Sequence, residues 1–334
     1  MSFKAGKLPV RLLAGLLKRY ARGGKGVVIG PSVGIDSAVI DVKGGFLAAK
    51  TDPITFVADD IGFYTVYINA NDIAVMGGTP RWLLVTILLP EGKATEGLVK
   101  RIFSQLYRTC RDLDVALCGG HTEVTRGIDR PIVIGAMLGV VPEDRVITGA
   151  GARPGDDIIL TKGIAIEAAS VIARVREKEL ARIFPKPFIV KCKNLIKRPG
   201  LGVVKDAKAA LKWGRVHAMH DPTEGGLATG LHELAIASGC GVLVDKASIP
   251  VLPEARRLCA HFGLDVMGAI ASGALIISVA PEDSGRVIKG LDKAGIRAAV
   301  IGRVTRKREG VKIIEGGKLK PLRLFERDEV TRIL

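Results

Sequence analysis

The sequence predicts a protein of mixed α and β structure with two domains, and three observations support this prediction. The chain has 334 residues, and a single hydrophobic core rarely serves a chain of this length. Hydrophobic residues make up 48% and charged residues 25%, the balance of a soluble globular protein. Short apolar runs alternate with longer amphipathic segments, a pattern typical of α/β or α+β folds.

The turn-rich segment GAGARPGDD at 149–157 marks the expected boundary, so the domains are predicted at 1–150 and 151–334. In the first domain we expect helices at 8–21, 61–78 and 94–111, and strands at 26–30, 37–42, 46–52, 81–90, 115–120 and 131–141. In the second we expect helices at 164–180, 201–213, 225–238, 253–263 and 282–294, and strands at 158–163, 241–245, 274–280 and 298–304. The charged run 306–309 is expected to be a solvated turn.

Composition argues against a membrane protein and against a disulfide-stabilised one. The longest apolar run, 268–280, is shorter than the ~20 residues that span a bilayer, and no signal peptide is visible. The basic first 25 residues are interpreted as an amphipathic helix that starts at Pro9, rather than as a transit peptide. Five scattered cysteines without a CxxC pair favour a reducing, cytoplasmic environment over a disulfide framework or a zinc ribbon.

The formal net charge of +16 requires an explanation. One Gln and three Asn beside many Lys and Arg residues indicate a thermophile. Aromatic residues make up only 4% of the chain, too few for a convincing base-stacking surface, so a nucleic-acid partner is not expected. The remaining interpretation is a polyanionic small ligand.

Acidic residues recur at strand ends and turns of the first half, namely at Asp36, Asp52, Asp60 and Asp72. A purely structural interpretation explains three of them: Asp36 and Asp60 could be caps or turn residues, and Asp52 could be a turn residue before Pro53. Asp72 is harder to explain in this way, because it lies inside an apolar helical run, where a carboxylate is costly without a partner. Converging carboxylates suit Mg²⁺, which also bridges phosphate oxygens.

In the second half, the segment His220 to Gly226 ends a strand-like stretch and opens a helix. Its backbone N–H groups could hold an anion, or the segment could be no more than a capped helix start. His217 and His220 could form a metal pair on a helix, although no third ligand is in view. Gly30 to Gly34 matches the G-x-S-x-G nucleophile elbow, but a strand-like stretch follows where that motif needs a helix. No P-loop motif is present.

These motifs resemble those of the AIR synthase-like superfamily, which includes aminoimidazole ribonucleotide synthetase, selenophosphate synthetase, thiamine-monophosphate kinase and the hydrogenase maturation factor HypE. The resemblance covers roughly 26–305, with the motifs in the family's order. They are Gly34-Ile35-Asp36-Ser37-Ala38-Val39, Thr51-Asp52, Asp60-Ile61-Gly62 with Asn71-Asp72-Ile73-Ala74, Gly119-Gly120-His121-Thr122, and His220-Asp221-Pro222-Thr223 with Gly225-Gly226-Leu227. The last of these, together with Ala271 to Leu275, is most similar to the HypE branch.

The resemblance implies two domains of the AIR synthase-like fold, the N-terminal one forming a barrel-like dimer core and binding ATP. It implies a homodimer, ATP and Mg²⁺ as cofactors, a maturation partner protein, and phosphoryl transfer that activates a substrate oxygen. Alternatives are a small-metabolite kinase or ligase, and a nucleotide-binding scaffold without turnover. The implied metal ligands are Asp36, Asp52 and Asp72, the implied catalytic residues are His121 and Asp221, and the remaining nucleotide contacts are Ser37, Asp60, Asn71, Gly119, Gly120, Thr122, Thr223, Gly225 and Gly226.

His121 stands where other branches carry Asp or Glu. Because Mg²⁺ prefers oxygen ligands, we interpret His121 as a phosphate or substrate contact rather than as a metal ligand. It could also be a bystander on a tight turn.

Three departures from the family pattern bear on the reaction. Ile35 replaces the first of two frequent Asp residues, Glu224 stands where HypE commonly has Arg, and Leu334 stands where HypE has its terminal Cys. The resemblance is therefore to the HypE scaffold and not to its final chemistry.

Overall fold

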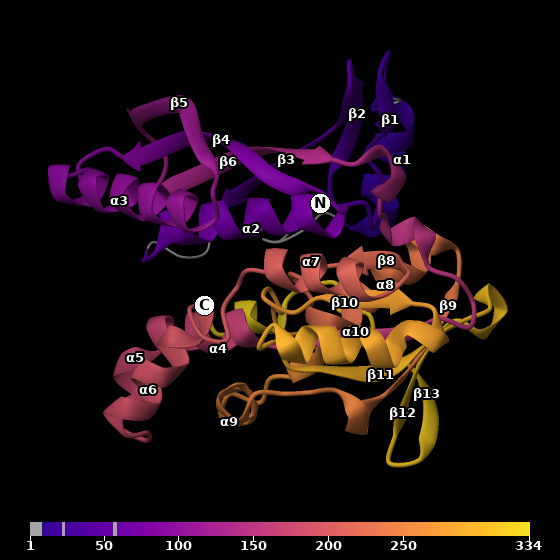
Figure 1. Ribbon diagram of the computed structural model, residues 1–334. Helices are drawn as coiled ribbons and strands as arrows, with labels where there is room; N and C mark the ends of the chain where they lie inside the picture. The colour runs from indigo at the N-terminus through magenta and orange to yellow at the C-terminus, as the bar shows by residue number, and fades with distance from the viewer. Residues whose placement is uncertain (1–8, 22–23, 56–58) are drawn as a thin grey trace. The chain divides into compact units, whose positions relative to one another are not determined.

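The structure is a computed structural model that describes residues 9–21, 24–55 and 59–334. It divides into two compact units, described separately below and drawn in Figure 1. The N-terminal unit contains 24–30 and 36–146, and the C-terminal unit contains 9–21, 31–35 and 147–334. Thus the first helix and the segment 31–35 group with the C-terminal unit, although they precede the expected boundary. Lys4, Lys7 and Arg22, part of the basic N-terminal stretch, lie outside the described residues.

The N-terminal unit is built on a six-stranded sheet of order β1-β2-β3-β6-β4-β5. Its neighbouring strands are antiparallel except for β4 and β5. The strands are β1 (Val27–Ile29), β2 (Ala38–Val42), β3 (Gly45–Ile54), β4 (Thr79–Pro90), β5 (Ala116–Thr125) and β6 (Ile132–Val141). Helix α2 (Ile61–Val75) packs on β3, β6 and β4, and α3 (Glu96–Asp112) packs on α2 and β5.

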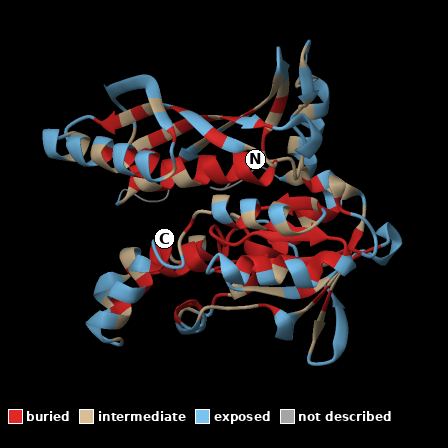
Figure 2. Ribbon diagram, in the orientation of Figure 1, coloured by how far each residue is buried: buried red, intermediate tan, exposed pale blue. Residues whose placement is uncertain are grey.

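Helix α2 is buried along almost its whole length, as Figure 2 shows. Apolar residues occur all round it, so it has no solvent face of the kind that an amphipathic surface helix keeps. The sheet face that meets α2 carries Leu83, Val85 and Ile87, all buried. The side chains of Trp82 and Leu84 alternate with these and belong to the opposite face, where they are 39% and 41% exposed. We call this opposite side the open face of the N-terminal sheet.

The C-terminal unit is built on a seven-stranded sheet of order β13-β12-β9-β11-β7-β10-β8. The strands are β7 (Asp157–Thr161), β8 (Val216–His220), β9 (Gly241–Asp245), β10 (Ile276–Val279), β11 (Ala298–Thr305), β12 (Val311–Glu315) and β13 (Lys318–Pro321). Helix α8 (Gly226–Ser238) packs into a core with Ile158, Leu160 and Ile276. Helices α7 (Val204–Trp213) and α10 (Pro281–Lys293) pack on each other, while α4 (Ile166–Val175) contacts α9 (Pro253–His261), α5 (Glu177–Leu180) and α6 (Lys186–Lys193). Helix α1 (Val10–Tyr20) has no buried residue.

Several elements differ from the sequence-based prediction. The expected helix 164–180 is interrupted at Arg176, and β5 continues to Thr125 instead of ending at 120. Helix α6 and the hairpin β12–β13 were not expected. The hairpin has a recognisable signal, because Gly316 and Gly317 both have positive φ and form the two-residue turn between the paired Glu315 and Lys318.

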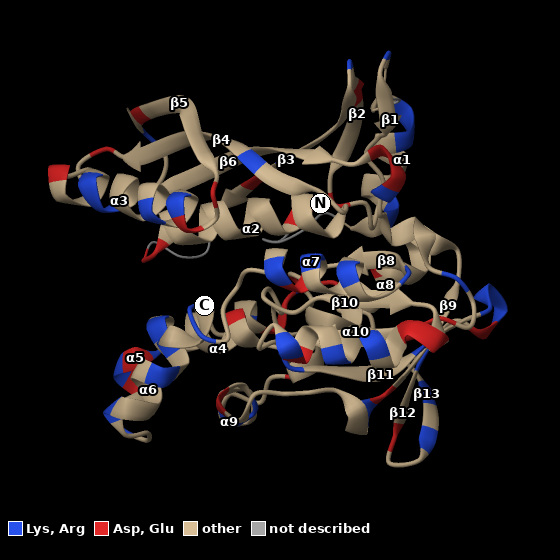
Figure 3. Cartoon of the chain, in the orientation of Figure 1, with Lys and Arg blue, Asp and Glu red and all other residues tan. Residues whose placement is uncertain are grey.

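Charge is unevenly distributed between the units. Acidic residues slightly outnumber basic ones in the N-terminal unit, so the positive surplus of the chain belongs to the C-terminal unit (Figure 3). All five cysteines are free. Among the described residues, no helix has both the length and the apolar character needed to cross a membrane.

Candidate functional site

The conspicuous polar group of the N-terminal unit lies between β3 and α2. Lys50 and Asp52 are two positions apart in β3, so both lie on the side of the strand that faces α2. Asp72 is in the last turn of that helix. The Lys50 ammonium nitrogen is 3.4 Å from Asp52 Oδ2 and 3.2 Å from Asp72 Oδ2. We use the name carboxylate group for the cluster formed by the three carboxylates of Asp36, Asp52 and Asp72 together with the Lys50 ammonium. No basic residue lies within four positions of Asp72 in the sequence, and its basic partner, Lys50, comes from β3.

No local sequence pattern indicates this ion pair, because Lys50 is far from Asp72 along the chain. Burial by itself lowers the pKa of Lys50, but the carboxylates of Asp72, Asp52 and Asp36 outweigh this effect. As a result, the pKa of Lys50 is raised above its ordinary value, and the ammonium stays charged. Asp36 contributes less to this effect than Asp72 and Asp52 do.

Hydrogen bonds fix the backbone around the carboxylate group. Ser37 Oγ donates to the carbonyl oxygen of Asp72 at 2.9 Å, which ties the start of β2 to α2. The backbone N–H of Asp52 donates to Asn69 Oδ1 at 2.9 Å, and Asn69 Nδ2 donates to the carbonyl of Thr65. Asn71 is buried in α2. Asn69 was absent from the predicted site, although it is the residue that joins β3 to α2 beside Asp52.

The purely structural interpretation is not supported for Asp52, whereas for Asp60 one of its two forms agrees with the structure. Asp52 lies within β3, not in a turn before Pro53. Asp60 precedes α2 with φ 57°, in the left-handed region, and its side chain does not cap the helix. It remains a turn residue at the start of α2.

The carboxylate group has the properties of a cation site. Its donors are carboxylate oxygens, the hard ligands that Mg²⁺ prefers. A cation of the chain itself, the Lys50 ammonium, is already held between two of them. The carboxylate oxygens of Asp52 and Asp72 therefore suit a divalent metal ion by their chemistry, and Asp36 remains a candidate ligand by its motif.

Gly119, Gly120, His121 and Thr122 lie inside strand β5 and do not form a turn. The interpretation of His121 as a turn bystander is thus wrong. Both glycines have positive φ, and a Cβ atom on Gly120 would lie 1.8 Å from the carbonyl oxygen of Val85. Gly120 is accordingly required by the close approach of β5 to β4.

His121 is separated from the carboxylate group. Pairing places Pro53, Ile134, Thr86 and His121 in one row across β3, β6, β4 and β5, so three strand spacings, roughly 14 Å, separate β3 from His121. The row belongs to the open face, whereas Lys50 and Asp52 face α2. His121 Nε2 lies 3.2 Å from Glu123 Oε2, and the His121 side chain is 66% exposed.

The predicted anion-binding site at the start of α8 in the C-terminal unit is occupied by groups of the chain itself. Gly225 precedes α8 with φ 78°, and its N–H donates to Asp328 Oδ2 at 2.8 Å. The N–H of Gly226 donates to the carbonyl of Thr223 at 3.0 Å. The expectation of free N–H groups at this helix start is therefore corrected for both glycines, because a residue near the C-terminus and a local turn use them.

The two histidines of the same segment do not form a metal pair. They lie on strand β8 and not on a helix, so the helical spacing on which the pair was predicted is absent. His217 Nδ1 is 2.9 Å from Asp156 Oδ1, and the buried His220 Nε2 is 3.0 Å from Glu233 Oε2. Each histidine thus has its own carboxylate partner. Asp221, the next residue, is buried.

A buried acidic group that the sequence did not indicate lies beside the start of α8. Burial raises the pKa of Glu167 to about 8; the Ser272 hydroxyl opposes this effect, and the carboxylates of Glu224 and Asp328 add to it. Burial also raises the pKa of Asp328 to about 6, although the N–H groups of Gly225 and Val330 stabilise its charged form. Backbone hydrogen bonds from Ala168 to Ile270 and from Ala271 to Thr223 join these segments.

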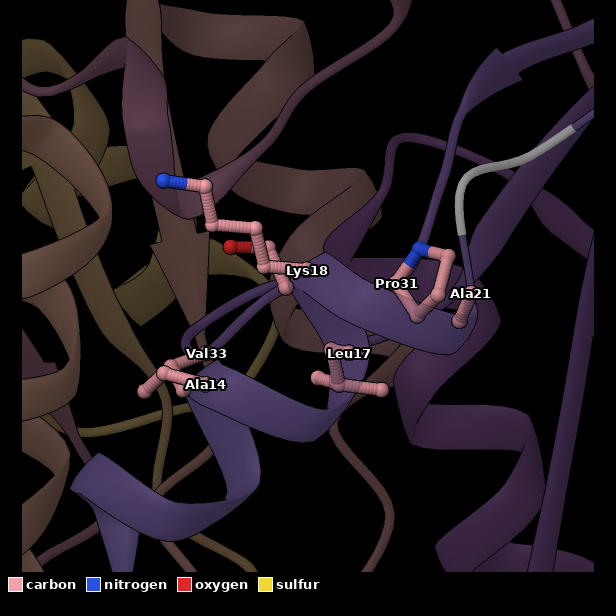
Figure 4. A pocket seen from close by; sticks show the side chains of 7 residues that line it. Ala14, Leu17, Lys18, Ala21, Pro31 and Val33 are labelled. Atoms are coloured by element: carbon pink, nitrogen blue, oxygen red, sulfur yellow. The ribbon is translucent and has the colours of Figure 1, made fainter.

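A surface pocket lies beside α1, and Figure 4 shows it from close by. Ala14, Leu17, Lys18 and Ala21 line it from the helix, and 31–33 line it from the following segment. None of the predicted site residues is among these lining residues. Ser32 of the G-x-S-x-G match lies here, and the next element in the chain is strand β2, so the helix that a nucleophile elbow needs is missing.

Two mixed α/β units, the first with a carboxylate group between a strand and a buried helix, define the two-domain AIR synthase-like class of protein. The chain belongs to the AIR synthase related family, since the N-terminal domain model of that family matches 34–141 and the C-terminal domain model matches 153–314. It is an enzyme of this family.

Relatives and solved structures agree with this assignment. The chain is 30% identical over 288 residues to the carbamoyl dehydratase HypE of Escherichia coli, covering 84% of this chain and 82% of that protein. It is 29% identical over 313 residues to the selenide, water dikinase of Methanocaldococcus jannaschii, covering 87% of each. A crystal structure of the hydrogenase maturation protein HypE in complex with ATP shares the fold, with a TM-score of 0.71, 24% identity and coverage of 98% of this chain and 97% of that one. So does a chain in a crystal structure of a HypE–HypF complex, with a TM-score of 0.72, 21% identity and coverage of 87% of this chain and 93% of that one.

Proposed function

We propose that the chain is an Mg²⁺- and ATP-dependent enzyme that activates a substrate oxygen by phosphoryl transfer, as in hydrogenase maturation. The observation that supports the proposal most directly is the position of the Lys50 ammonium between Asp52 and Asp72, because these two carboxylates together bind a positive charge. Two relatives with names that denote a dehydratase and a dikinase support the reaction class. A HypE solved with ATP supports the nucleotide.

Asp36, Asp52 and Asp72 would hold the metal ion, which would neutralise the charge of the phosphate oxygens. Ser37 and Asn69 keep the backbone of Asp72 and Asp52 in place through the hydrogen bonds described above. These bonds fix the backbone from which the two carboxylates project before any ligand binds, which lowers the cost of ordering the site.

The other residues of the proposed site remain assigned by motif. Asp60, Asn71, Gly119, Gly120 and Thr122 of the N-terminal unit are proposed to contact nucleotide, as are Thr223, Gly225 and Gly226 of the C-terminal unit. His121 and Asp221 are the proposed catalytic residues. For Gly225, an anion would have to replace the Asp328 carboxylate on its N–H group.

We propose further that the chain forms a homodimer through the open face of the N-terminal sheet. Trp82, Leu84 and Val140 leave apolar surface there, 39%, 41% and 44% exposed. His121 is on the same face, so it would act at or beside the contact between two chains. The HypE–HypF complex supports an additional maturation partner protein.

Calorimetric titration with a non-hydrolysable ATP analogue, with and without Mg²⁺, tests the proposal directly. We expect binding that strengthens when Mg²⁺ is present. Absence of binding at millimolar nucleotide contradicts the proposal. Rapid turnover with small phosphorylated metabolites would instead favour a kinase or ligase, to which the similarity to a dikinase gives some support. Tight nucleotide binding without phosphate release would favour a scaffold.

A further inference from the structure

Lys50 has an unusual position for a residue that no motif of the site includes. Its side chain is 23% exposed and contacts Asp72, which is 7% exposed, and Asp52, which is 35% exposed. It comes from β3, in register with the buried Met137 of β6, so the strand aims it at α2. The ammonium therefore occupies the space that the carboxylates of Asp52 and Asp72 share.

An ammonium group and a divalent cation compete for the same oxygen atoms. Two cations held by one pair of carboxylates lie within a few ångströms of each other, and at such distances repulsion in a partly buried site is strong. The carboxylates, for their part, need a counter-charge at all times, because Asp72 is buried. One of the two cations must be present, and the arrival of the second displaces the first.

We propose that Lys50 is the internal counter-ion of the metal site and prevents a divalent cation from binding unless a polyphosphate binds with it. Without ligand, Lys50 neutralises Asp52 and Asp72. When a metal ion binds together with a polyphosphate, the ammonium leaves the carboxylates and pairs with phosphate oxygens, so that no charge remains unpaired. This inference rests on the function proposed above and makes Lys50 a positioning residue that couples metal binding to nucleotide binding.

The test measures binding of Mn²⁺, used as a spectroscopic substitute for Mg²⁺, by electron paramagnetic resonance. Lys50→Met keeps an unbranched side chain that is one heavy atom shorter and removes the charge. We expect Lys50→Met to bind Mn²⁺ without nucleotide at least ~10-fold more tightly than the parent chain. The parent should bind Mn²⁺ tightly only when the ATP analogue is added. Lys50→Arg, which keeps the charge, should behave like the parent.

Lys100→Met is the matched control. Lys100 lies in the same unit and pairs with Glu96 at the exposed surface of α3. Its loss removes the same charge and should leave Mn²⁺ binding within about twofold of the parent.

A structural role alone predicts a different result. If Lys50→Met is folded by circular dichroism and binds Mn²⁺ no more tightly than the parent, the proposal is wrong. Lys50→Met could be unfolded when a chelator removes all metal ions, and in that case Mn²⁺ alone should restore its fold. Lys50→Gln is the second variant for this test. If Mn²⁺ restores neither variant, the proposal is also wrong.

The outcomes separate this inference from the proposed function. Tight binding of Mn²⁺ by the parent without nucleotide overturns the role of Lys50 and leaves ATP dependence intact. Enhanced Mn²⁺ binding by Lys50→Met in a chain that binds no nucleotide supports the counter-ion role and overturns the proposed function.

Discussion

The Asp328 carboxylate accepts a hydrogen bond from the backbone N–H of Gly225 at 2.8 Å, across 103 residues of sequence. Its other oxygen, Oδ1, accepts from the N–H of Val330 at 2.8 Å. One side chain therefore joins the beginning of α8 to the end of the chain. The sequence leaves open whether this helix start holds an anion or is only capped, and in the structure a carboxylate of the protein itself accepts from it.

This relationship predicts the effect of Asp328→Ala on stability. The change leaves two buried N–H groups without their acceptor, so we expect the free energy of unfolding to fall by about 1–3 kcal/mol. Urea unfolding at pH 7 measures the loss. Glu326→Ala is the control, because Glu326 is exposed two residues away and should change stability by less than about 0.5 kcal/mol. Equal stability of Asp328→Ala and the parent would show that the bond contributes nothing.

Glu167 predicts a dependence of stability on pH. Its pKa is raised from 4.5 to about 8, so between these values the folded chain keeps a proton that the unfolded chain releases. The contribution of Glu167 is thus fully present below about pH 4.5, falls as pH rises, and is lost above about pH 8. We expect Glu167→Gln to lose less stability than the parent between pH 5 and pH 8.5.

Urea unfolding across that pH range measures the difference between the two chains. Glu326→Gln is the control, since an exposed carboxyl group should leave the pH profile of the parent unchanged. Parallel profiles for Glu167→Gln and the parent would mean that Glu167 titrates normally.

Asp72→Asn should weaken binding of the Mg²⁺–ATP-analogue complex by at least ~10-fold, because it removes one proposed ligand. From the sequence alone, this change is expected to leave the ligand-free chain equally stable or slightly more stable. The ion pair with Lys50 reverses that expectation, since the ammonium loses one of its two carboxylate partners. We now expect a modest loss of stability.

Calorimetry gives the affinity of Asp72→Asn and urea unfolding gives its stability. Asp129→Asn, an exposed site in the same unit, controls for loss of charge. Unchanged affinity in a folded Asp72→Asn chain would assign Asp72 a structural role only.

Trp82→Glu tests the proposed dimer. A charge on the open face should be unfavourable in an apolar interface and should shift the chain to a monomer at micromolar concentration. Light scattering after size-exclusion chromatography measures the mass. Leu319→Glu, on β13 of the C-terminal unit with 57% of its surface exposed, should leave the mass unchanged. A parent chain that is already monomeric would contradict the dimer.

The sequence by itself determined the features that depend on neighbouring residues and on motif order. Apolar runs and the Gly and Pro residues that bound them located α2, β4 and α8 within a few residues, because the ends of helices and strands follow local patterns. Motif order identified the family, and the position of Asp72 in an apolar helix singled it out as a residue in need of a positive partner. Those inferences needed only the identity of residues close together in the chain.

Only the tertiary structure decided which residues meet. Lys50 reaches Asp72 because β3 lies along α2, and Asp328 reaches Gly225 because the end of the chain returns to α8. His121 lies in a strand on the open face, since pairing with β4 extends β5 past its two glycines. Local sequence patterns do not encode these contacts, because strand pairing and helix packing join segments at any separation along the chain, and the register of each pairing decides which face a side chain occupies.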